Sequence, residues 1–402
     1  MTPQRQNFKV ASDRCDVGGV AHLGDAMHSH PSENHPGDSG AQPGGTPEWL
    51  AAAVMTMMRT GRIPGLSLVV VDSQRSLYAG GFGTADLATE APATPATVYL
   101  WFSMTKIVTA TAAMTLVEDG RLELDAPVAD YVDCLRAPRA SQPTVGQLLT
   151  HTAGLSNPLP LRWVHPAEQE PPAAEDLLRS VMRRPRAYRH APGHRARYTN
   201  VGYLALGQII EAVSGMPVTS YLQQAVLDPV GMTSTGFTYR PEAPAATGCV
   251  RAPRAADPLL RRLLPPGVAG TRHGAYLGLR PFYVDGAAYG GLVGDVTDAG
   301  RFLRLHLGDG QIDGHRILSA ETARSMRVIE HPGKPFDHGI GWFRRPTQET
   351  GQWVEHFGAG AGFWNVMRLY PEHGLGIVVM TNSTTSYDFE PLFSLLTTAS
   401  CA

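Results

Sequence analysis

Segments with the composition of β-strands lie near both ends of this chain, and a long helical, loop-rich stretch separates them. Near the start, Leu66–Asp72 and Ser76–Gly83 are predicted to form a hairpin. Near the end, strands are expected at Gln352–Phe357, Phe363–Tyr370 and Leu375–Asn382. Strands at both ends with helices between them predict one α/β lobe built from discontinuous segments, with a helical lobe inserted into it.

We therefore expect a discontinuous α/β domain over residues 47–100 and 291–402, and a helical domain over residues 101–290. Residues 1–46 are rich in Gly, Pro, His and Ser, which predicts a disordered polar tail. The clearest helices are expected at Glu48–Thr60, Ser103–Asp119, Thr144–Leu155 and Asn200–Gly215.

Composition narrows the class of protein. The 402 residues are 43% hydrophobic and 17% charged, which is typical of a folded globular protein. A net charge of -2 gives no electrostatic argument for binding nucleic acid or an anionic membrane. The four cysteines lack metal-ligand spacing, so no metal and no cofactor is expected. No signal-peptide core and no apolar run long enough to span a membrane is found, so a cytoplasmic location is expected. The sequence leaves the oligomeric state open.

The run "YLWFSMTKIVTA" carries a hydroxyl and an amine inside an otherwise apolar helix. Ser103 and Lys106 are three residues apart, so both project from one helix face. A serine hydroxyl becomes a good nucleophile only when a neighbouring base takes its proton. Burial can make lysine such a base by lowering its pKa, whereas arginine does not lose its proton in proteins. The alternative is a helix-start serine beside a lysine that extends to solvent.

Two later segments add further polar groups. "YTN" places Tyr198 and Asn200 at the start of a helix, and "HFG" places His356 on a strand that runs into a glycine-rich turn. Together with "SMTK", they resemble the three motifs of the serine β-lactamase/penicillin-binding-protein superfamily, in the branch that holds class C β-lactamases, D-Ala-D-Ala carboxypeptidases and family VIII carboxylesterases. The order matches, and the intervals from Ser103 to Tyr198 and on to His356 are 95 and 158 residues.

The resemblance implies a β-lactamase/transpeptidase-like α/β (α+β) fold, with an antiparallel sheet flanked by helices and an inserted all-helical lobe. It also implies catalytic roles. Ser103 would form an acyl-enzyme, Lys106 and Tyr198 would move its proton, and Asn200 would hold the lysine and the substrate. His356 would orient the tyrosine or the leaving group. The backbone N–H groups of Ser103 and Ala359 would form the oxyanion hole.

Other residues are assigned to substrate binding. Gly358 and Gly360 would let a substrate lie close to their strand. Trp163 lies in a proline-rich loop that either faces the substrate or is a plain surface loop. His151 in "LLTHTAGL" is interpreted as a structural residue at a helix end. Structural roles remain the alternative for the motif residues: a helix entry with Asn200 as N-cap, and an ordinary strand histidine at His356.

The activity expected is that of a carboxylesterase, a serine hydrolase that cleaves a small-molecule acyl ester. His356 stands where class C β-lactamases have lysine, and a mostly neutral histidine supplies less charge for a substrate carboxylate. The alternatives are a β-lactamase, a D-aminopeptidase or D-Ala-D-Ala carboxypeptidase, and a thioesterase or acyltransferase of biosynthesis. A non-enzymatic alternative is a penicillin-binding-type sensor or a structural protein.

Overall fold

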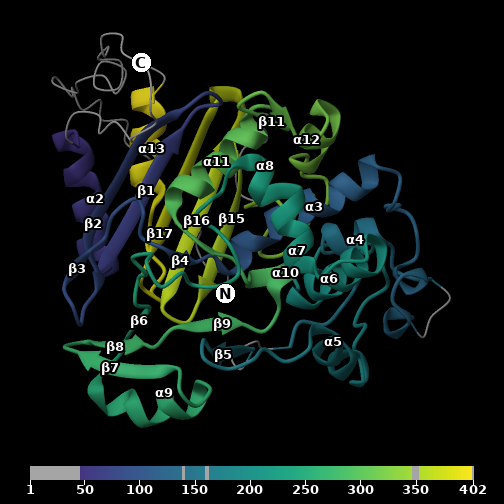
Figure 1. Cartoon of the computed structure of the whole chain (residues 1–402), viewed down its shortest axis with the longest axis horizontal. Coiled ribbons are helices and arrows are strands. Elements are labelled where there is room, and N and C mark those ends of the chain that lie inside the picture. The colour runs from purple at the N-terminus through teal and green to yellow at the C-terminus, as the bar shows by residue number, and fades with distance from the viewer. Residues whose placement is uncertain (1–45, 138–140, 159–162, 346–352, 401–402) are drawn as a thin grey trace, which may run out of the picture.

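The structure is a computed structural model that describes residues 46–137, 141–158, 163–345 and 353–400. Its largest element is an eight-stranded antiparallel sheet in the order β13-β14-β15-β16-β17-β1-β2-β3 (Figure 1). The strands are β1 (Gly65–Val71), β2 (Ser76–Asp86), β3 (Ala91–Pro92), β13 (Asp337–His338), β14 (Phe343–Arg344), β15 (Val354–Gly360), β16 (Phe363–Tyr370) and β17 (Leu375–Thr381). Because β1 pairs directly with β17, the predicted single sheet from distant segments is confirmed.

Helices cover both faces of this sheet, and the side chains of β1 divide between them. Leu66, Leu68 and Val70 pack into the cluster beneath α2 (Glu48–Gly61) and α13 (Glu390–Ser400). Val69 and Val71 point the other way, into the larger cluster that includes α11 (Val296–Leu307). Successive strand residues point to opposite faces, so a strand covered on both sides is apolar throughout, as "LSLVVVD" is.

The remaining helices lie mostly between the two groups of sheet strands in the sequence and gather beside the sheet (Figure 1). They are the α-helices α3 (Thr105–Glu118), α4 (Val145–Leu149), α5 (Ala174–Met182), α6 (Asn200–Ser214), α7 (Val218–Leu222), α8 (Asp228–Val230), α9 (Asp257–Leu263), α10 (Ala287–Gly290) and α12 (Ala320–Met326). The single-turn segments are η1 (Phe102–Met104), η2 (Val128–Asp130), η3 (Asp133–Leu135), η4 (Gln223–Leu227), η5 (Arg254–Ala256) and η6 (Pro371–His373).

The inserted region is not all-helical, which corrects that expectation. Two small sheets, β5-β9 and β6-β8-β7, lie within it. Their strands are β5 (Val164–Pro166), β6 (Cys249–Arg251), β7 (Ala269–His273), β8 (Tyr276–Leu279) and β9 (Phe282–Val284). Strands this short show too few alternations for a periodicity argument. β5 and β6 pair with segments far away in the sequence, whereas β7 and β8 form a local hairpin. Two further small sheets pair β4 (Tyr99–Leu100) with β10 (Val293–Gly294) and β11 (Gln311–Ile312) with β12 (His315–Arg316).

Helix α4 is much shorter than the expected helix over Thr144–Leu155. It begins as expected, with a capping box between Thr144 and Gln147. It ends at Leu149 because His151 has φ of 59°, in the left-handed region, which no helix interior accommodates. The prediction of this helix's length was therefore wrong.

Two expectations concern the chain outside this core. Apart from Thr46, the predicted tail lies outside the described residues. Within the described ranges, no single helix is long and apolar enough to cross a membrane. One pair of helices, Asn200–Ser214 and Val218–Val230, reaches that length and apolarity only when the two are counted together across an 80° bend.

Strand β15 packs tightly against η1, the turn that carries Ser103. A Cβ atom on Gly358 would lie 2.0 Å from the carbonyl oxygen of Trp101, and one on Gly360 would lie 2.1 Å from the Phe102 ring. Glycine at these positions therefore lets the strand and the turn approach each other. The space beside the Gly358 Cα is filled by the Trp101 backbone. This differs from the expectation that Gly358 makes room for substrate.

This packing predicts that Gly358→Ala destabilises the protein, because the clash is with main-chain atoms that cannot rotate away. Overpacking of this kind costs about 1–3 kcal/mol of unfolding free energy, measurable by urea or thermal denaturation. The matched control is Gly236→Ala, since a Cβ there would meet nothing within 4 Å. Equal stability of the two variants would contradict the packing account.

Candidate active site

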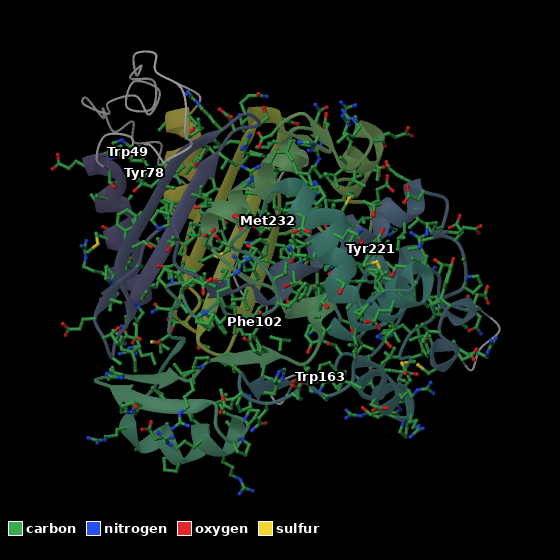
Figure 2. All side chains as sticks on the ribbon, viewed as in Figure 1. Trp49, Tyr78, Phe102, Trp163, Tyr221 and Met232 are labelled. Carbon is green, nitrogen blue, oxygen red and sulfur yellow. The ribbon has the colours of Figure 1, made fainter. Side chains whose placement is uncertain are left out.

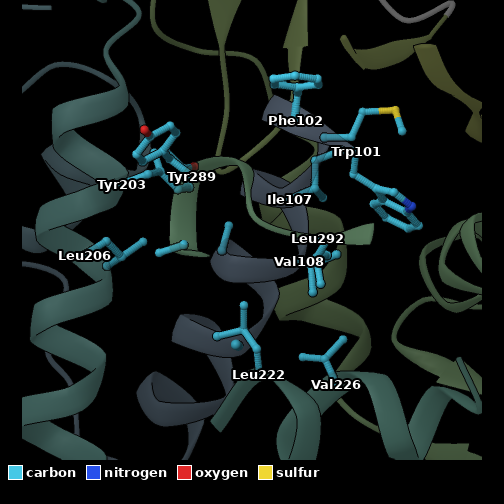
Figure 3. Packing of buried hydrophobic residues seen from close by; sticks show 14 of the residues in the cluster. Trp101, Phe102, Ile107, Val108, Tyr203, Leu206, Leu222, Val226, Tyr289 and Leu292 are labelled. Atoms are coloured by element: carbon cyan, nitrogen blue, oxygen red, sulfur yellow. The ribbon is translucent and has the colours of Figure 1, made fainter. Parts of the chain in front are cut away.

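Ser103 lies on the single-turn segment η1 immediately before α3. The preceding residue, Phe102, has φ of 46°, an unfavourable conformation for a residue with a bulky side chain. Surrounding contacts hold it: the Trp101 N–H donates to the Leu292 carbonyl at 2.8 Å, and the Phe102 ring packs 6.1 Å from that of Phe363. Figure 3 shows the Trp101 and Phe102 side chains leaving this turn in different directions. The turn is therefore fixed on both sides of its backbone.

Lys106 is fully buried and has three polar neighbours. Its Nζ lies 3.0 Å from Ser103 Oγ, 2.9 Å from Asn200 Oδ1 and 2.9 Å from the Tyr289 carbonyl oxygen. None of these partners is a carboxylate, and burial lowers the pKa of Lys106 well below its ordinary value of 10.5. Burial therefore favours the neutral amine over the ammonium ion.

The neighbours of the amine determine where its lone pair points. A neutral amine has two N–H donors and one lone pair. The oxygens of Asn200 and Tyr289 are acceptors only and take the two N–H groups. The lone pair is then directed at the remaining neighbour, the Ser103 hydroxyl, 3.0 Å away. This is the geometry required for an amine to take the serine proton.

Tyr198 has its ring partly exposed and its hydroxyl buried. Burial raises the pKa of Tyr198, and the nearby Ser103 side chain only partly opposes the rise. The phenol is therefore protonated at neutral pH, while burial favours the neutral form of the Lys106 amine. Lys106 Nζ lies 4.9 Å from the centroid of the Tyr198 ring. Of the two groups, the amine is thus in the form of a base and the phenol in the form of an acid.

Three buried histidines surround the Tyr198 ring. The ring centroids of His151, His338 and His356 lie 4.7, 6.2 and 6.0 Å from that of Tyr198. Burial lowers the pKa of each, of His338 to about 3. All three rings are therefore uncharged at neutral pH, and none supplies a cation that would favour a tyrosinate.

Two of these histidines also have defined backbone contacts. The Thr199 N–H donates to His151 Nδ1 at 3.3 Å, which ties the ring to the segment that follows Tyr198. His151, interpreted from the sequence as structural, thus contacts the site without lining its cavity. His356 Nδ1 lies 2.7 Å from the carbonyl oxygen of Phe357. Since a carbonyl only accepts, Nδ1 carries the hydrogen of the neutral ring.

Asn200 is the first residue of α6. The N-cap is Thr199, whose hydroxyl accepts from the Val201 N–H, so the alternative role of Asn200 as N-cap does not apply. The Asn200 N–H donates to Asn157 Oδ1 at 3.0 Å, and its side-chain oxygen is free to accept from Lys106. The helix start therefore positions the amide at the amine.

A cavity of about 240 Å³ opens beside Ser103. Its lining includes Trp163 and two of the β15 residues singled out from the sequence, Ala359 and Gly360. Figure 2 shows Phe102 and Trp163 in the same part of the molecule, near β9. Within the described ranges no charged side chain lines this cavity; the other lining residues there are Phe102, Val164, Asn200, Leu264, Val284, Tyr289, Gly290 and Ala361. Ser103 therefore faces a small, uncharged space.

The structure thus brings Ser103, Lys106, Tyr198, Asn200 and His356 into one region, with Trp163, Ala359 and Gly360 around the adjoining cavity. Their catalytic roles, and the oxyanion hole at Ser103 and Ala359, stay predictions. The sequence reasoning missed His338, Asn157 and the Tyr289 carbonyl. "SNP" hinted at a turn residue at Asn157, but a backbone carbonyl has no sequence signal. Among the described residues, no cluster of three or more His, Cys, Asp or Glu side chains could hold a metal.

Comparisons with known proteins agree with this geometry. The protein-family model described as "Beta-lactamase" matches residues 50–394. The chain is 28% identical over 365 residues to "Protein Rv1367c" of Mycobacterium tuberculosis (strain ATCC 25618 / H37Rv). The aligned region covers 85% of this chain and 80% of that protein. Among solved structures, the octameric penicillin-binding protein homologue from Pyrococcus abyssi is similar with a TM-score of 0.72 and 26% identity, over 86% of this chain and 76% of the other. EstCE1, described as a hydrolase with promiscuous acyltransferase activity, shares the fold, with a TM-score of 0.68 and 22% identity over 88% of this chain and 98% of its own.

The neutral Lys106 predicts how the reactivity of Ser103 depends on pH. A fluorophosphonate probe should label Ser103, and the rate should rise with pH as Lys106 loses its proton. Because burial lowers this pKa, the rate should level off below pH 10.5. Lys106→Arg should label far more slowly at every pH, since arginine stays protonated.

Mass spectrometry of the labelled peptide is the measurement, and Ser103→Ala is the control for labelling elsewhere. Thermal unfolding of Lys106→Arg would show whether the variant is folded. A rate that still rises beyond pH 10.5, or an adduct on another residue, would contradict the assignment of nucleophile and base.

Proposed function

The chain belongs to the beta-lactamase family of serine hydrolases, and from this premise we propose that it is a carboxylesterase that cleaves esters of small, uncharged acyl groups through an acyl-enzyme on Ser103. The observation that carries the proposal is the uncharged lining of the 240 Å³ cavity beside Ser103. An acyl group with a carboxylate or an ammonium would lose its hydration there without gaining a partner, which is costly.

The size of the cavity supports a short acyl group. Pockets that hold drug-sized ligands measure about 300–1,000 Å³, so a volume near 240 Å³ favours a chain of a few carbons. Trp163, Leu264 and Val284 give this space apolar walls. Burial of the acyl chain there would contribute about 0.8 kcal/mol for each CH₂ group.

The proposed first step uses the groups in the protonation states described above. Ser103 Oγ attacks the ester carbonyl as its proton passes to the neutral amine of Lys106. The negative charge that develops on the carbonyl oxygen is stabilised by the N–H groups of Ser103 and Ala359; one such donor is worth about 100- to 1,000-fold in rate. The C–O bond to the leaving group then breaks, and that oxygen takes the Tyr198 proton.

The second step returns the enzyme to its starting form. The proton on Lys106 passes to Tyr198, which restores the phenol and the neutral amine. Water then attacks the acyl-enzyme as Lys106 takes one of its protons. The Ser103–acyl bond breaks as Lys106 gives that proton to Ser103 Oγ, 3.0 Å away, which releases the carboxylic acid and restores the serine and the neutral amine. Asn200 and the Tyr289 carbonyl hold the amine in place throughout, at 2.9 Å each.

The histidine of the third motif also supports this choice. Burial lowers the pKa of His356 well below 6.5. The ring is uncharged at neutral pH, so it offers no permanent cation for the carboxylate that β-lactams and D-Ala-D-Ala peptides carry. This favours the ester hydrolase over the β-lactamase and the carboxypeptidase.

A panel of p-nitrophenyl esters tests the proposal. We expect turnover of the acetyl and butyryl esters, weak turnover of the octanoyl ester, and loss of activity by at least about 1,000-fold in Ser103→Ala. The corresponding p-nitroanilides and nitrocefin test the amide alternatives. Equal hydrolysis by wild type and Ser103→Ala would refute the assignment, and stable acylation without turnover would indicate a sensor.

The lining of the cavity predicts a change in acyl preference. Trp163→Ala should enlarge the cavity and raise the ratio of kcat/KM for octanoyl over acetyl esters several-fold. The matched control is Trp49→Ala, because Trp49 packs on the opposite face of the sheet. If both variants change the overall rate and leave the ratio as in the wild type, Trp163 does not determine acyl length.

A further inference from the structure

A second hollow, of about 740 Å³, is lined in part by Tyr198. Four of its lining residues are cations: Arg189, Arg195, Arg197 and Lys334. None of its lining residues in the described part of the chain is acidic. We call this hollow the basic groove. The chain as a whole has a net charge of -2, so its composition does not account for the concentration of positive charge here.

The four cations have no acidic partners within the described parts of the chain. Other arginines of this protein do pair: Arg301 with Asp313, and Arg324 with Asp309. The nearest carboxylate in the sequence, Asp337, accepts from the Gly333 N–H and is not part of the groove lining. The pKa of His190, which lines the groove, is lowered by burial. The positive charges of the nearby Arg197 and Arg195 lower this pKa further. Unneutralised cations in a concave site attract anions.

Backbone hydrogen bonds hold the two walls of the groove together. The Ala196 N–H donates to the Pro332 carbonyl at 3.2 Å and joins the segment that carries Arg195 and Arg197 to the one that carries Lys334. The Arg189 N–H donates to the Gly154 carbonyl, and the Arg197 N–H to the His151 carbonyl, both at 2.8 Å. The groove is therefore formed before any ligand binds, which reduces the entropy lost on binding.

Tyr198 and Asn157 connect the groove to the reacting atoms. Tyr198 lines the groove, and Asn157 lines it while accepting from the N–H of Asn200, which in turn lines the Ser103 cavity. A general acid must lie within reach of the atom that it protonates. In the proposed function Tyr198 protonates the leaving group, so the leaving group lies on the groove side and the acyl group on the side of the uncharged cavity.

We propose that the basic groove is a leaving-group subsite for a phosphate, so that the preferred substrates are short-chain acyl esters of phosphorylated alcohols. This inference rests on the proposed function. Guanidinium groups bind phosphate oxygens through paired, charge-assisted hydrogen bonds, and three arginines and a lysine line this groove. A single carboxylate would occupy little of a 740 Å³ groove and meet only part of its charge. Release of the phosphorylated alcohol follows the same bond breaking and proton transfer described above.

Two acetyl esters that differ only in the phosphate test the proposal: acetyl glycerol 3-phosphate and acetyl glycerol. The wild type should show a kcat/KM for the phosphorylated ester higher by about tenfold or more, as expected for charge-assisted contacts, and added salt should reduce this preference. In the double variant Arg189→Gln/Arg195→Gln the ratio of the two kcat/KM values should fall towards one. Neither of these positions is adjacent to Tyr198.

The matched control is Arg183→Gln/Arg184→Gln, which removes the same charge from exposed positions outside the groove lining. This control should keep the wild-type ratio. A wild-type ratio near one, or an equal fall in both double variants, would overturn the subsite.

Calorimetric titration with glycerol 3-phosphate separates failure of the subsite from failure of the proposed function. The wild type and the control should bind it and the groove variant should not, with glycerol as the neutral reference. If the groove variant loses glycerol 3-phosphate binding and the wild type hydrolyses neither ester, the anion site is supported and the esterase is refuted. Ester hydrolysis with no phosphate binding would refute the subsite alone. If glycerol 3-phosphate binds but the phosphorylated ester is not preferred over acetyl glycerol, the groove is a site for free phosphate. That outcome would also overturn the leaving-group role.

Discussion

The burial of Lys106 without a carboxylate partner is the constraint on which the rest of the site depends. A buried ammonium ion without a counter-charge is expensive, so burial lowers the pKa of Lys106 and favours the neutral amine. The two acceptor oxygens around Nζ, from Asn200 and Tyr289, then leave the lone pair for Ser103. An acidic residue among these neighbours would restore the charge and remove the base. The composition of the surroundings therefore decides the chemistry as much as the lysine does.

The same principle of charge distribution distinguishes the cavity beside Ser103 from the basic groove that Tyr198 lines. Among the described residues, the cavity has no charged side chain, while the groove has four cations and no acid. Tyr198 keeps its proton because burial raises its pKa and the three histidines around it are uncharged. A protonated phenol at the cationic groove is well placed to protonate an anionic leaving group that binds there.

Local patterns predicted most of the elements that position the site. The β-branched composition of β1 is that of a buried strand in any fold, so the strands and the Ser103 helix could be named in advance. The group of catalytic candidates could be named because its three motifs resemble those of a known superfamily. The length of α4 could not be predicted, because it depends on the left-handed conformation of His151, which is stabilised by packing against Tyr198 and His338. The strands β5 to β9 were missed because each is only three to five residues long, and β5 and β6 also pair with distant segments.

The sequence by itself determined that a serine and a lysine share one helix face, that a tyrosine, an asparagine and a histidine accompany them in a known order, and that the ends of the chain form one sheet. Only the tertiary structure decided the protonation states. The oxygens that hold the amine come from residues 94 and 183 positions away, and one of them is a backbone carbonyl that any residue could supply. Burial and long-range contacts set a pKa, and neither is written in the local pattern of residues.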